Sequence, residues 1–258
     1  MTLNILRAFT CVGLAAAVLF TGCKSGSMFT PKPDNTLYVG VTPDYAPIVF
    51  KQNNQITGLE VDFARELGLA LKRPVEFVPV KWNDQIEALL TDQVDIIMSG
   101  MTITNPRKIR IAFSDPYLKE GLTCLIRRND LQRYTKPEAI INENINFGVQ
   151  QGSTADVFVN QRCKNAISIT YIDPRDAQFN LVNRKIDVFI HDSPAVLWLA
   201  SESEADLAVV PPPMTEEYLA WGLRKDDSEL LQTVNENLKR WKQDGTYQRI
   251  LKRWLPAL

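Results

Sequence analysis

The sequence predicts an α/β protein with two lobes, each a mostly parallel sheet flanked by helices. Short apolar runs alternate with segments whose apolar residues recur at helical spacing, which is the pattern of a parallel sheet with helices on its faces. This progression occurs twice, and both passes close on similar pieces, QVDIIMSG at 93–100 and KIDVFIHD at 185–192. The chain has 258 residues and 45% hydrophobic content, which is sufficient for two cores.

The first pass begins with LYVGV at 37–41, an apolar and β-favouring run that predicts a strand. A loop follows, and after Gly58 a helix is predicted from the spacing of Val61, Ala64, Leu67 and Leu71. A second strand is expected at 75–80, with Trp82 opening the next loop. Ile86, Leu89 and Leu90 predict a second helix, which leads to a strand after Asp95.

The second pass repeats the order of the first. We expect a strand at 145–150, a polar turn at 152–154 that enters a helix near Val157, and a strand at 167–171. A helix is expected around 179–182 and a closing strand at 186–190, directly before His191 and Asp192. Two units of the same plan in one chain indicate two lobes rather than one large sheet.

Two extended apolar pieces, Gly121 to Arg127 and Leu207 to Pro213, are expected to cross between the lobes as a pair of hinge strands. After the second crossing the chain returns to the first lobe, and an amphipathic helix follows with an apolar face made by Leu230, Leu231, Val234, Leu238 and Trp241. Residues 244–247 interrupt this helix before a last helical segment ends near Trp254. The expected division is therefore lobe 1 at 37–121, lobe 2 at 122–212, and the return with the C-terminal helices at 213–258.

Composition and charge exclude several classes of function. The chain holds 29 lysines and arginines against 30 aspartates and glutamates, and no basic stripe with interleaved aromatic residues occurs, so a nucleic acid is not an expected partner. There is one histidine and no CxxC motif, so neither a metal site nor a cofactor is expected. We expect a monomer.

The N-terminal region predicts export. Arg7 precedes an apolar run from Ala8 to Phe20, which is shorter than the roughly 20 residues of a membrane-spanning helix. We therefore read 1–22 as a signal peptide. The small residues before Cys23 resemble a bacterial lipobox, which implies a lipid on Cys23 and a polar tether at 23–36; ordinary secretory cleavage is the alternative. Export leaves Cys124 and Cys163 in an oxidising compartment, where the sequence does not decide whether they pair.

The segment 95–117, DIIMSGMTITNPRKIRIAFSDPY, carries the strongest functional signal. A short buried strand ends in Ser99 and Gly100, and Thr102 and Arg107 follow. A guanidinium is a rigid fork of donors that fits a carboxylate in bidentate fashion, and ligands of open α/β sheets lie at the carboxyl ends of strands. A surface arginine in a loop is the simpler alternative.

The pattern GMTIT-x-x-R before FSDPY closely resembles the signature of the bacterial extracytoplasmic solute-binding proteins of family 3, the receptors of polar amino-acid ABC importers. GLRKDD at 222–227 and QDGTYQRILKRW at 243–254 are also typical of that family, so the resemblance spans 37–254. Pro106 and Ala112 depart from the family pattern, in which an acidic residue is usual at each position. The resemblance implies a periplasmic-binding-protein-like fold of type II with two hinge strands.

The resemblance also implies the ligand contacts. Arg107 and Thr102 would hold the α-carboxylate of an amino acid, with Ser153 and Thr154 contributing from the second lobe, where a helix start favours an anion. Asp192 would hold the α-ammonium; for it and for the Ser153–Thr154 turn, helix capping is the alternative. Further expected contacts are the backbone at Ser99 and Gly100, the rings of Tyr45 and Trp82, and Thr42. A neutral residue at position 42 argues weakly against a cationic ligand side chain, although Asp44 or Glu60 would compensate.

The expected function is that of a lipid-anchored extracytoplasmic receptor, which binds a free amino acid between its lobes and delivers it to an ABC permease in the membrane. The chain is not expected to be an enzyme. Two alternatives stay open: a cyclohexadienyl dehydratase acting on prephenate or arogenate, with Asp156 as general acid, and an amino-acid-sensing lipoprotein without a transport role. His191 is expected to be solvated, and Asp95 and Asp187 are expected to pair at strand starts away from the cleft.

Overall fold

The structure, a computed structural model, describes residues 35–256. The predicted signal peptide and Cys23 lie outside these residues, as does the tether except for Asn35 and Thr36. Between residues 35 and 256, none of the helices has both the length and the apolar character that a membrane span requires.

The first lobe is built on a five-stranded mixed sheet with the order β5-β1-β6-β15-β7. Strands β1 (Leu37–Val41), β5 (Val75–Pro79) and β6 (Ile96–Ile97) are parallel, as predicted. Strand β15 (Gly222–Leu223) comes from the far end of the chain and pairs antiparallel with both β6 and β7 (Ala112–Phe113). The return of the chain after the second lobe thus completes the first sheet.

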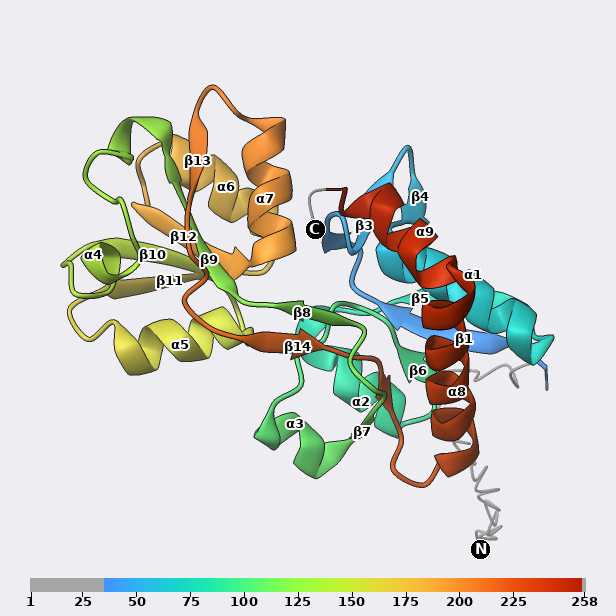
Figure 1. Cartoon of the computed structure of the whole chain (residues 1–258). Helices are drawn as coiled ribbons and strands as arrows, with labels where there is room; N and C mark the ends of the chain where they lie inside the picture. Colours follow the sequence, from blue (N-terminus) through green and yellow to red (C-terminus); the bar gives the residue numbers. More distant parts are fainter. Residues whose placement is uncertain (1–34, 257–258) are drawn as a thin grey trace, which may run out of the picture. The chain divides into compact units, whose positions relative to one another are not determined.

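The helices of the first lobe cover this sheet with an aromatic core (Figure 1). Phe63 of α1 (Leu59–Leu71) packs against the rings of Tyr117, Trp221 and Trp241, with centroids 5.5–5.9 Å away. The apolar face predicted for the C-terminal helix is buried at Leu230, Val234, Leu238 and Trp241. The remaining helical segments of this lobe are η1 (Trp82–Asp84), α2 (Gln85–Leu90), α3 (Asn105–Arg110), α8 (Ser228–Asp244) and α9 (Thr246–Trp254).

The second lobe has a five-stranded sheet with the order β11-β10-β12-β9-β13. Strands β10 (Asn146–Gln150), β11 (Ile167–Tyr171) and β12 (Val188–Asp192) are parallel, whereas β9 (Leu122–Arg127) runs antiparallel to both β12 and β13 (Leu207–Val210). Its helical segments are η2 (Arg128–Asp130), α4 (Glu138–Ile141), α5 (Thr154–Arg162), α6 (Pro174–Val182) and α7 (Ser193–Glu202).

The segments that cross between the sheets differ from the predicted ones. The pieces expected as hinge strands form β9 and β13, which pair with each other inside the second sheet. They are apolar because they are buried there: Leu122, Cys124, Leu125 and Ile126 of β9 are fully buried. A continuous apolar run is typical of an interior strand. The prediction that these two runs cross between the lobes was therefore wrong.

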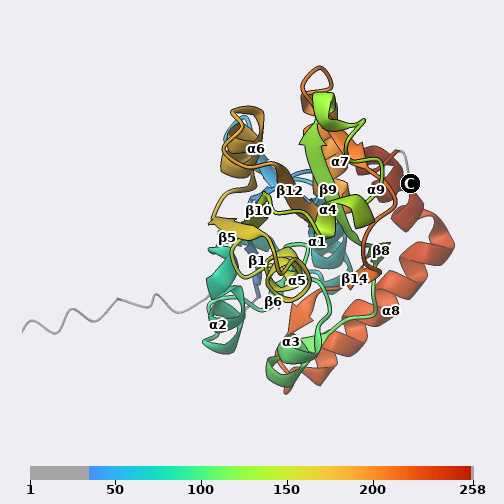
Figure 2. The same cartoon turned by 90° about the vertical axis from the view of Figure 1, so that its left-hand side faces the viewer.

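The crossing ribbon consists of β8 (Leu118–Glu120) and β14 (Glu217–Leu219), which pair antiparallel (Figures 1 and 2). The two chain segments come unusually close where β8 ends. A Cβ atom on Gly121 would lie 1.9 Å from the carbonyl oxygen of Thr215, so this position accepts only glycine. Met214 N–H donates to the Leu122 carbonyl at 2.7 Å and fixes the entry into the second lobe.

A small three-stranded sheet of β2 (Asp44–Tyr45), β3 (Val49–Gln52) and β4 (Gln55–Thr57) was not predicted. Its tight turn is formed by Asn53 and Asn54, with φ angles of 50° and 63°. Asparagine tolerates this left-handed conformation better than most residues, and paired turn residues of this kind join hairpin strands. The Asn-Asn pair was thus a usable signal.

Candidate functional site

Side chains from both lobes line one small cavity. Eight of the predicted contacts are among its lining residues: Tyr45, Trp82, Gly100, Thr102, Arg107, Ser153, Thr154 and Asp192. Two further lining residues, Gln150 and His191, were not predicted as contacts. Thr42 and Ser99 were predicted, but they are not among the residues that line the cavity.

Arg107 lies on α3, the short helix that follows the first sheet's central strand. Its guanidinium donates to the Thr102 carbonyl at 2.8 Å and to the Gly152 carbonyl of the second lobe at 3.5 Å. The same group lies over the ring of Trp82, 5.1 Å from the centroid. These contacts hold the guanidinium in place between the lobes, and burial lowers its pKa from the ordinary value. It remains protonated, because arginine keeps its proton even when buried.

Ser153 and Thr154 begin α5 at the edge of the second lobe. The Ser153 hydroxyl accepts a hydrogen bond from the Asp156 N–H at 3.2 Å and caps the helix. The expected capping role is therefore present, and Ser153 also lines the cavity. Gly152, just before the turn, accepts a bond from Trp82 Nε1 at 3.2 Å. This end of the cavity thus joins an arginine, two hydroxyl residues and a helix start, a group of donors suited to an anion.

Asp192 ends strand β12 and is 6% exposed. The Tyr45 hydroxyl of the first lobe donates to its carboxylate at 2.8 Å. Asp192 precedes α7, yet its carboxylate makes no capping hydrogen bond; Glu120 accepts from the Ser193 N–H instead, at 3.3 Å. The carboxylate of Asp192 is therefore directed across the cleft and not along its own helix.

Thr42 and Ser99 join the ends of two neighbouring strands. The Thr42 N–H donates to the Ser99 hydroxyl at 2.7 Å, and the Thr42 hydroxyl donates to the Val80 carbonyl at 2.9 Å. Gln85 donates to the same hydroxyl at 2.8 Å. The side chains of Thr42 and Ser99 therefore stabilise the strand ends. The sequence pattern does not distinguish a residue with this structural role from one that contacts a ligand.

Gly100 adopts φ +67°, and a Cβ atom there would lie 2.5 Å from Tyr45 Cε1. Its N–H donates to the buried carboxyl group of Glu60 at 2.8 Å. Burial raises the pKa of Glu60 to about 8, although the hydrogen bond from the Gly100 N–H lowers it. Glu60 thus holds the loop in place from within the core, and it does not line the cavity. The expectation that Glu60 would compensate for the neutral Thr42 is not supported by this placement.

His191 was predicted to be solvated, but it is 3% exposed. Strand β12 continues through His191, and the ring of Tyr45 covers it in an edge-on contact at 5.0 Å. His191 Nε2 and Gln150 Oε1 are 3.2 Å apart. The prediction was wrong because the strand end is covered by the other lobe, a contact that local sequence does not reveal.

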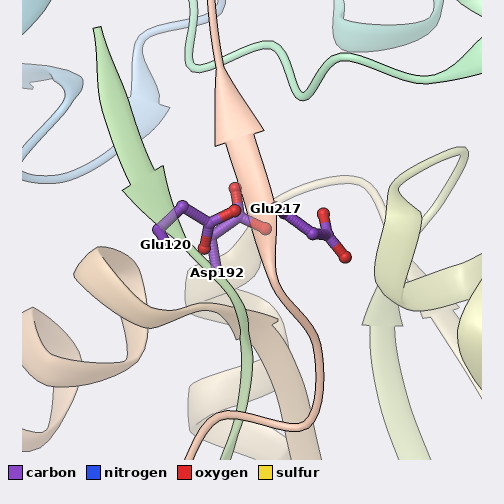
Figure 3. Close-up of side chains that lie close together, drawn as sticks. All are labelled: Glu120, Asp192 and Glu217. Carbon is purple, nitrogen blue, oxygen red and sulfur yellow. The ribbon is translucent and has the colours of Figure 1, made fainter. Parts of the chain in front are cut away.

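Three carboxyl groups converge where the crossing ribbon meets the cavity (Figure 3). Glu120 and Glu217 stand opposite each other on β8 and β14, and one oxygen from each lies within 4.8 Å of one oxygen of Asp192. Burial, and then the charges of Asp192 and Glu217, raise the pKa of Glu120.

Three other acidic residues, Asp156, Asp95 and Asp187, each pair with a group of their own lobe. Asp156 accepts from the Gly152 N–H at 3.0 Å and from Asn160 at 2.8 Å, and it is not among the residues that line the cavity. Asp95 contacts Arg73 at 3.1 Å, and Asp187 contacts Arg127 at 3.3 Å. These two pair at strand starts as predicted.

The two cysteines of the second lobe, Cys124 and Cys163, are both free and buried. Burial raises the pKa of each thiol, that of Cys163 to about 11. Neither thiol is therefore reactive in the folded protein.

Comparison with known proteins identifies relatives over nearly the whole chain. The family of bacterial extracellular solute-binding proteins, family 3, matches residues 37–257. The L-cystine-binding protein TcyJ of Escherichia coli K12 is 26% identical over 253 residues, which cover 95% of this chain and 94% of that protein.

Two solved structures resemble the fold closely. The ancestral amino-acid-binding protein AncCDT-1, a precursor of cyclohexadienyl dehydratase, is 37% identical with a TM-score of 0.81, covering 85% of this chain and 95% of that chain. A putative binding component of an ABC transporter from Wolinella succinogenes DSM 1740, complexed with lysine, is 30% identical with a TM-score of 0.82, covering 86% and 96%.

Proposed function

Because the chain belongs to the bacterial extracellular solute-binding proteins of family 3, we propose that it is an extracytoplasmic receptor for a free amino acid. It binds the amino acid between its lobes and delivers it to an ABC importer. The observation that supports this most directly is the pairing of charges across one cavity, with Arg107 from the first lobe and Asp192 from the second. This separation of charge is complementary to the carboxylate and ammonium of an α-amino acid.

Each end of the ligand has its own partners. The α-carboxylate is held by the guanidinium of Arg107 together with Thr102, Ser153 and Thr154. The α-ammonium replaces the Tyr45 hydroxyl as the donor to Asp192. Because the two charges lie on different lobes, a bound amino acid is held fully only when the lobes meet, and its differential affinity for that state shifts the lobes toward closure.

The strength of such a complex can be estimated from its charged hydrogen bonds. Each contributes about 1.5–3 kcal/mol. Three or four of them, less the cost of ordering the ligand, give about −8 kcal/mol, which corresponds to a micromolar complex. This is sufficient for a receptor that must also release its ligand.

We also propose how the receptor is held at the membrane. Residues 1–22 act as a signal peptide, Cys23 carries the lipid, and 23–36 form a flexible tether to a monomeric receptor, with 37–121 and 213–258 forming lobe 1 and 122–212 lobe 2. Incorporation of labelled palmitate into the wild-type chain, and its loss in Cys23→Ser, tests the anchor. A labelled Cys23→Ser chain would contradict it.

The function is tested by isothermal titration calorimetry with the twenty amino acids, after unfolding and refolding to remove carried-over ligand. We expect saturable binding of one or a few amino acids at micromolar or lower concentration. Arg107→Ala is expected to weaken it by at least a hundredfold, since two charge-assisted hydrogen bonds are lost. Arg110→Ala is the matched control, because Arg110 lies on the same helix, forms an ion pair with the exposed Glu87 at 3.2 Å and is not among the described residues that line the cavity. No binding across the panel, or full binding by Arg107→Ala, would contradict the proposal.

A further inference from the structure

We propose that the first lobe rests on a membrane surface that carries anionic phospholipid headgroups, through an open groove at the end of α1. This basic groove lies between the last turns of α1 and β5, the edge strand of the first sheet. Its lining includes Arg65, Leu69, Lys72, Arg73, Val75 and Phe77. The inference rests on the proposed lipid anchor, which would bring this surface to the membrane.

The charges of the basic groove are all positive. Among the described residues that line it, three are basic and none is acidic. The side chain of Arg65 is 57% exposed, and Lys72 is exposed and forms no ion pair with any residue between 35 and 256. Arg73 is held inward, because its guanidinium donates to the Asp95 carboxylate at 3.1 Å and to the Thr36 carbonyl at 2.6 Å. Arg65 and Lys72 are thus the cations available to an anionic partner.

The carboxylates of α1 and β5 do not neutralise the groove. Glu60 is fully buried, and Asp62 and Glu66 form ion pairs with arginines of α9, at 3.0 Å and 2.8 Å. Asp62 also lies 3.5 Å from Arg65, so it offsets that charge only in part. Glu76 of β5 points to the other face of the sheet from the groove residues of the same strand, because side chains alternate along a strand. The groove therefore keeps a net positive charge.

An apolar side chain lies between the two exposed cations. Leu69 follows Arg65 by one helical turn, precedes Lys72, and is 75% exposed. Helices that lie on bilayers combine basic residues, which are attracted to lipid phosphates, with apolar residues that enter the boundary of the acyl chains. A second copy of this chain is a poorer occupant, because it would bring the same cations against these. Charge complementarity therefore favours an anionic lipid surface.

The basic groove is also where the proposed tether joins the folded domain. Asn35, the first described residue, donates from its side chain to the Lys72 carbonyl at 3.4 Å. The Leu37 N–H donates to the Pro74 carbonyl at 2.8 Å. A flexible tether of the proposed length spans about 20 Å, and an anionic surface attracts basic side chains over about 8–10 Å. The anchor thus raises the local concentration of this groove at the headgroups.

Contact through the basic groove determines how the receptor stands on the membrane. Strands β1 and β5 begin beside the groove, at Leu37 and Val75. Trp82 follows the carboxyl end of β5 and lines the ligand cavity. The cavity therefore lies at the other end of these strands, away from the bilayer, and a receptor in this pose can take up its ligand from solution.

The test is electron paramagnetic resonance of the protein, purified from the membranes of the cells that express it and reconstituted into vesicles. One set of vesicles is neutral phosphatidylcholine, and the other also contains phosphatidylglycerol. A nitroxide on a cysteine at Leu69 reports depth, because oxygen relaxes it in the bilayer and an aqueous nickel complex relaxes it in solution. We expect bilayer contact in the anionic vesicles only, and its loss at high salt. A label at Ile167 of the second lobe, which is 59% exposed, should stay aqueous in both.

Lys72→Glu assigns the contact to the basic groove. It changes the charge by two, and each charge near an anionic surface alters the attraction about fivefold, so the ratio of docked to undocked molecules should fall about 25-fold. Lys51→Glu is the matched control, because Lys51 is exposed on β3 of the same lobe and is not among the described residues that line the groove. This control should leave the ratio unchanged.

The outcomes separate this inference from the proposed anchor. An aqueous label at Leu69 in anionic vesicles, equal contact in neutral ones, or an unchanged ratio in Lys72→Glu would overturn the inference while the anchor stands. Labels at Leu69 that broaden each other's spectra would show a second copy in the groove and overturn it as well. A chain without lipid that binds only anionic vesicles would support the groove and overturn the anchor, and a chain that binds neither kind of vesicle would overturn both.

Discussion

The hydrogen bond between Tyr45 and Asp192 predicts how strongly the two lobes hold each other. Tyr45→Phe removes the hydroxyl that donates to the buried Asp192 carboxylate at 2.8 Å and leaves the ring in place. A hydrogen bond to a charged group contributes about 1.5–3 kcal/mol. When the lobes separate, water replaces the partner of each group, so the substitution costs little in the open state. The ratio of closed to open molecules should therefore fall by about 10- to 150-fold.

The ratio can be measured from the distance between two spin labels on cysteines at Leu69 of the first lobe and Ile167 of the second, which are 75% and 59% exposed. The buried native cysteines should not be labelled. Tyr45→Phe should move the ligand-free distance distribution toward longer separations. Tyr247→Phe is the control, because its hydroxyl donates at 2.6 Å to the Tyr117 carbonyl within the first lobe. The reasoning would be refuted by a distribution in Tyr45→Phe identical to that of the wild type.

Three further predictions concern stability and reactivity. Gly100→Ala should lower the free energy of unfolding by at least about 2 kcal/mol, because of its positive φ and the 2.5 Å contact with a tyrosine ring. Gly245→Ala, with positive φ but no atom within 4 Å, should cost only about 1 kcal/mol in the same thermal melts. Because the pKa of Glu60 is raised from 4.5 to about 8, the contribution of Glu60 to stability should be full below pH 4.5 and be lost, by a few kcal/mol, toward pH 8, and Glu60→Gln should remove this decline in denaturant titrations. Cys124 and Cys163 are 0% and 3% exposed and should react with Ellman's reagent no faster than the protein unfolds; rapid labelling would contradict their burial.

The fold was largely predictable because its strands and helices carry local signals. Residues 37–41 and 167–171 are strands with the predicted bounds, since short β-favouring runs between turn residues have few alternatives. The crossing strands were misplaced because their pairing depends on partners about a hundred residues away. Neither LKE at 118–120 nor EYL at 217–219 has a distinctive composition.

Site residues could be predicted where they lie at a strand end or a helix start, because that position directs the side chain toward the cavity. Arg107, Ser153 and Asp192 follow such positions and line the cavity. Gln150 and His191 were missed because an amide and an imidazole at strand ends are ordinarily solvated. Residues of the opposite lobe contribute to their burial, since Tyr45 packs on His191 and Asp44 accepts from Gln150, and local sequence does not reveal these contacts.

The sheet order of the first lobe has a consequence for the order in which the protein is made. Strand β15, at residues 222–223, lies between β6 and β7, which are synthesised more than a hundred residues earlier. All five strands of the second sheet lie between Leu122 and Val210, so this lobe has its full set of strands while the first sheet still has a gap. A nascent chain therefore exposes unpaired backbone along β6 until residues 222–223 have emerged. The first lobe, whose synthesis begins earlier, is therefore completed after the second lobe.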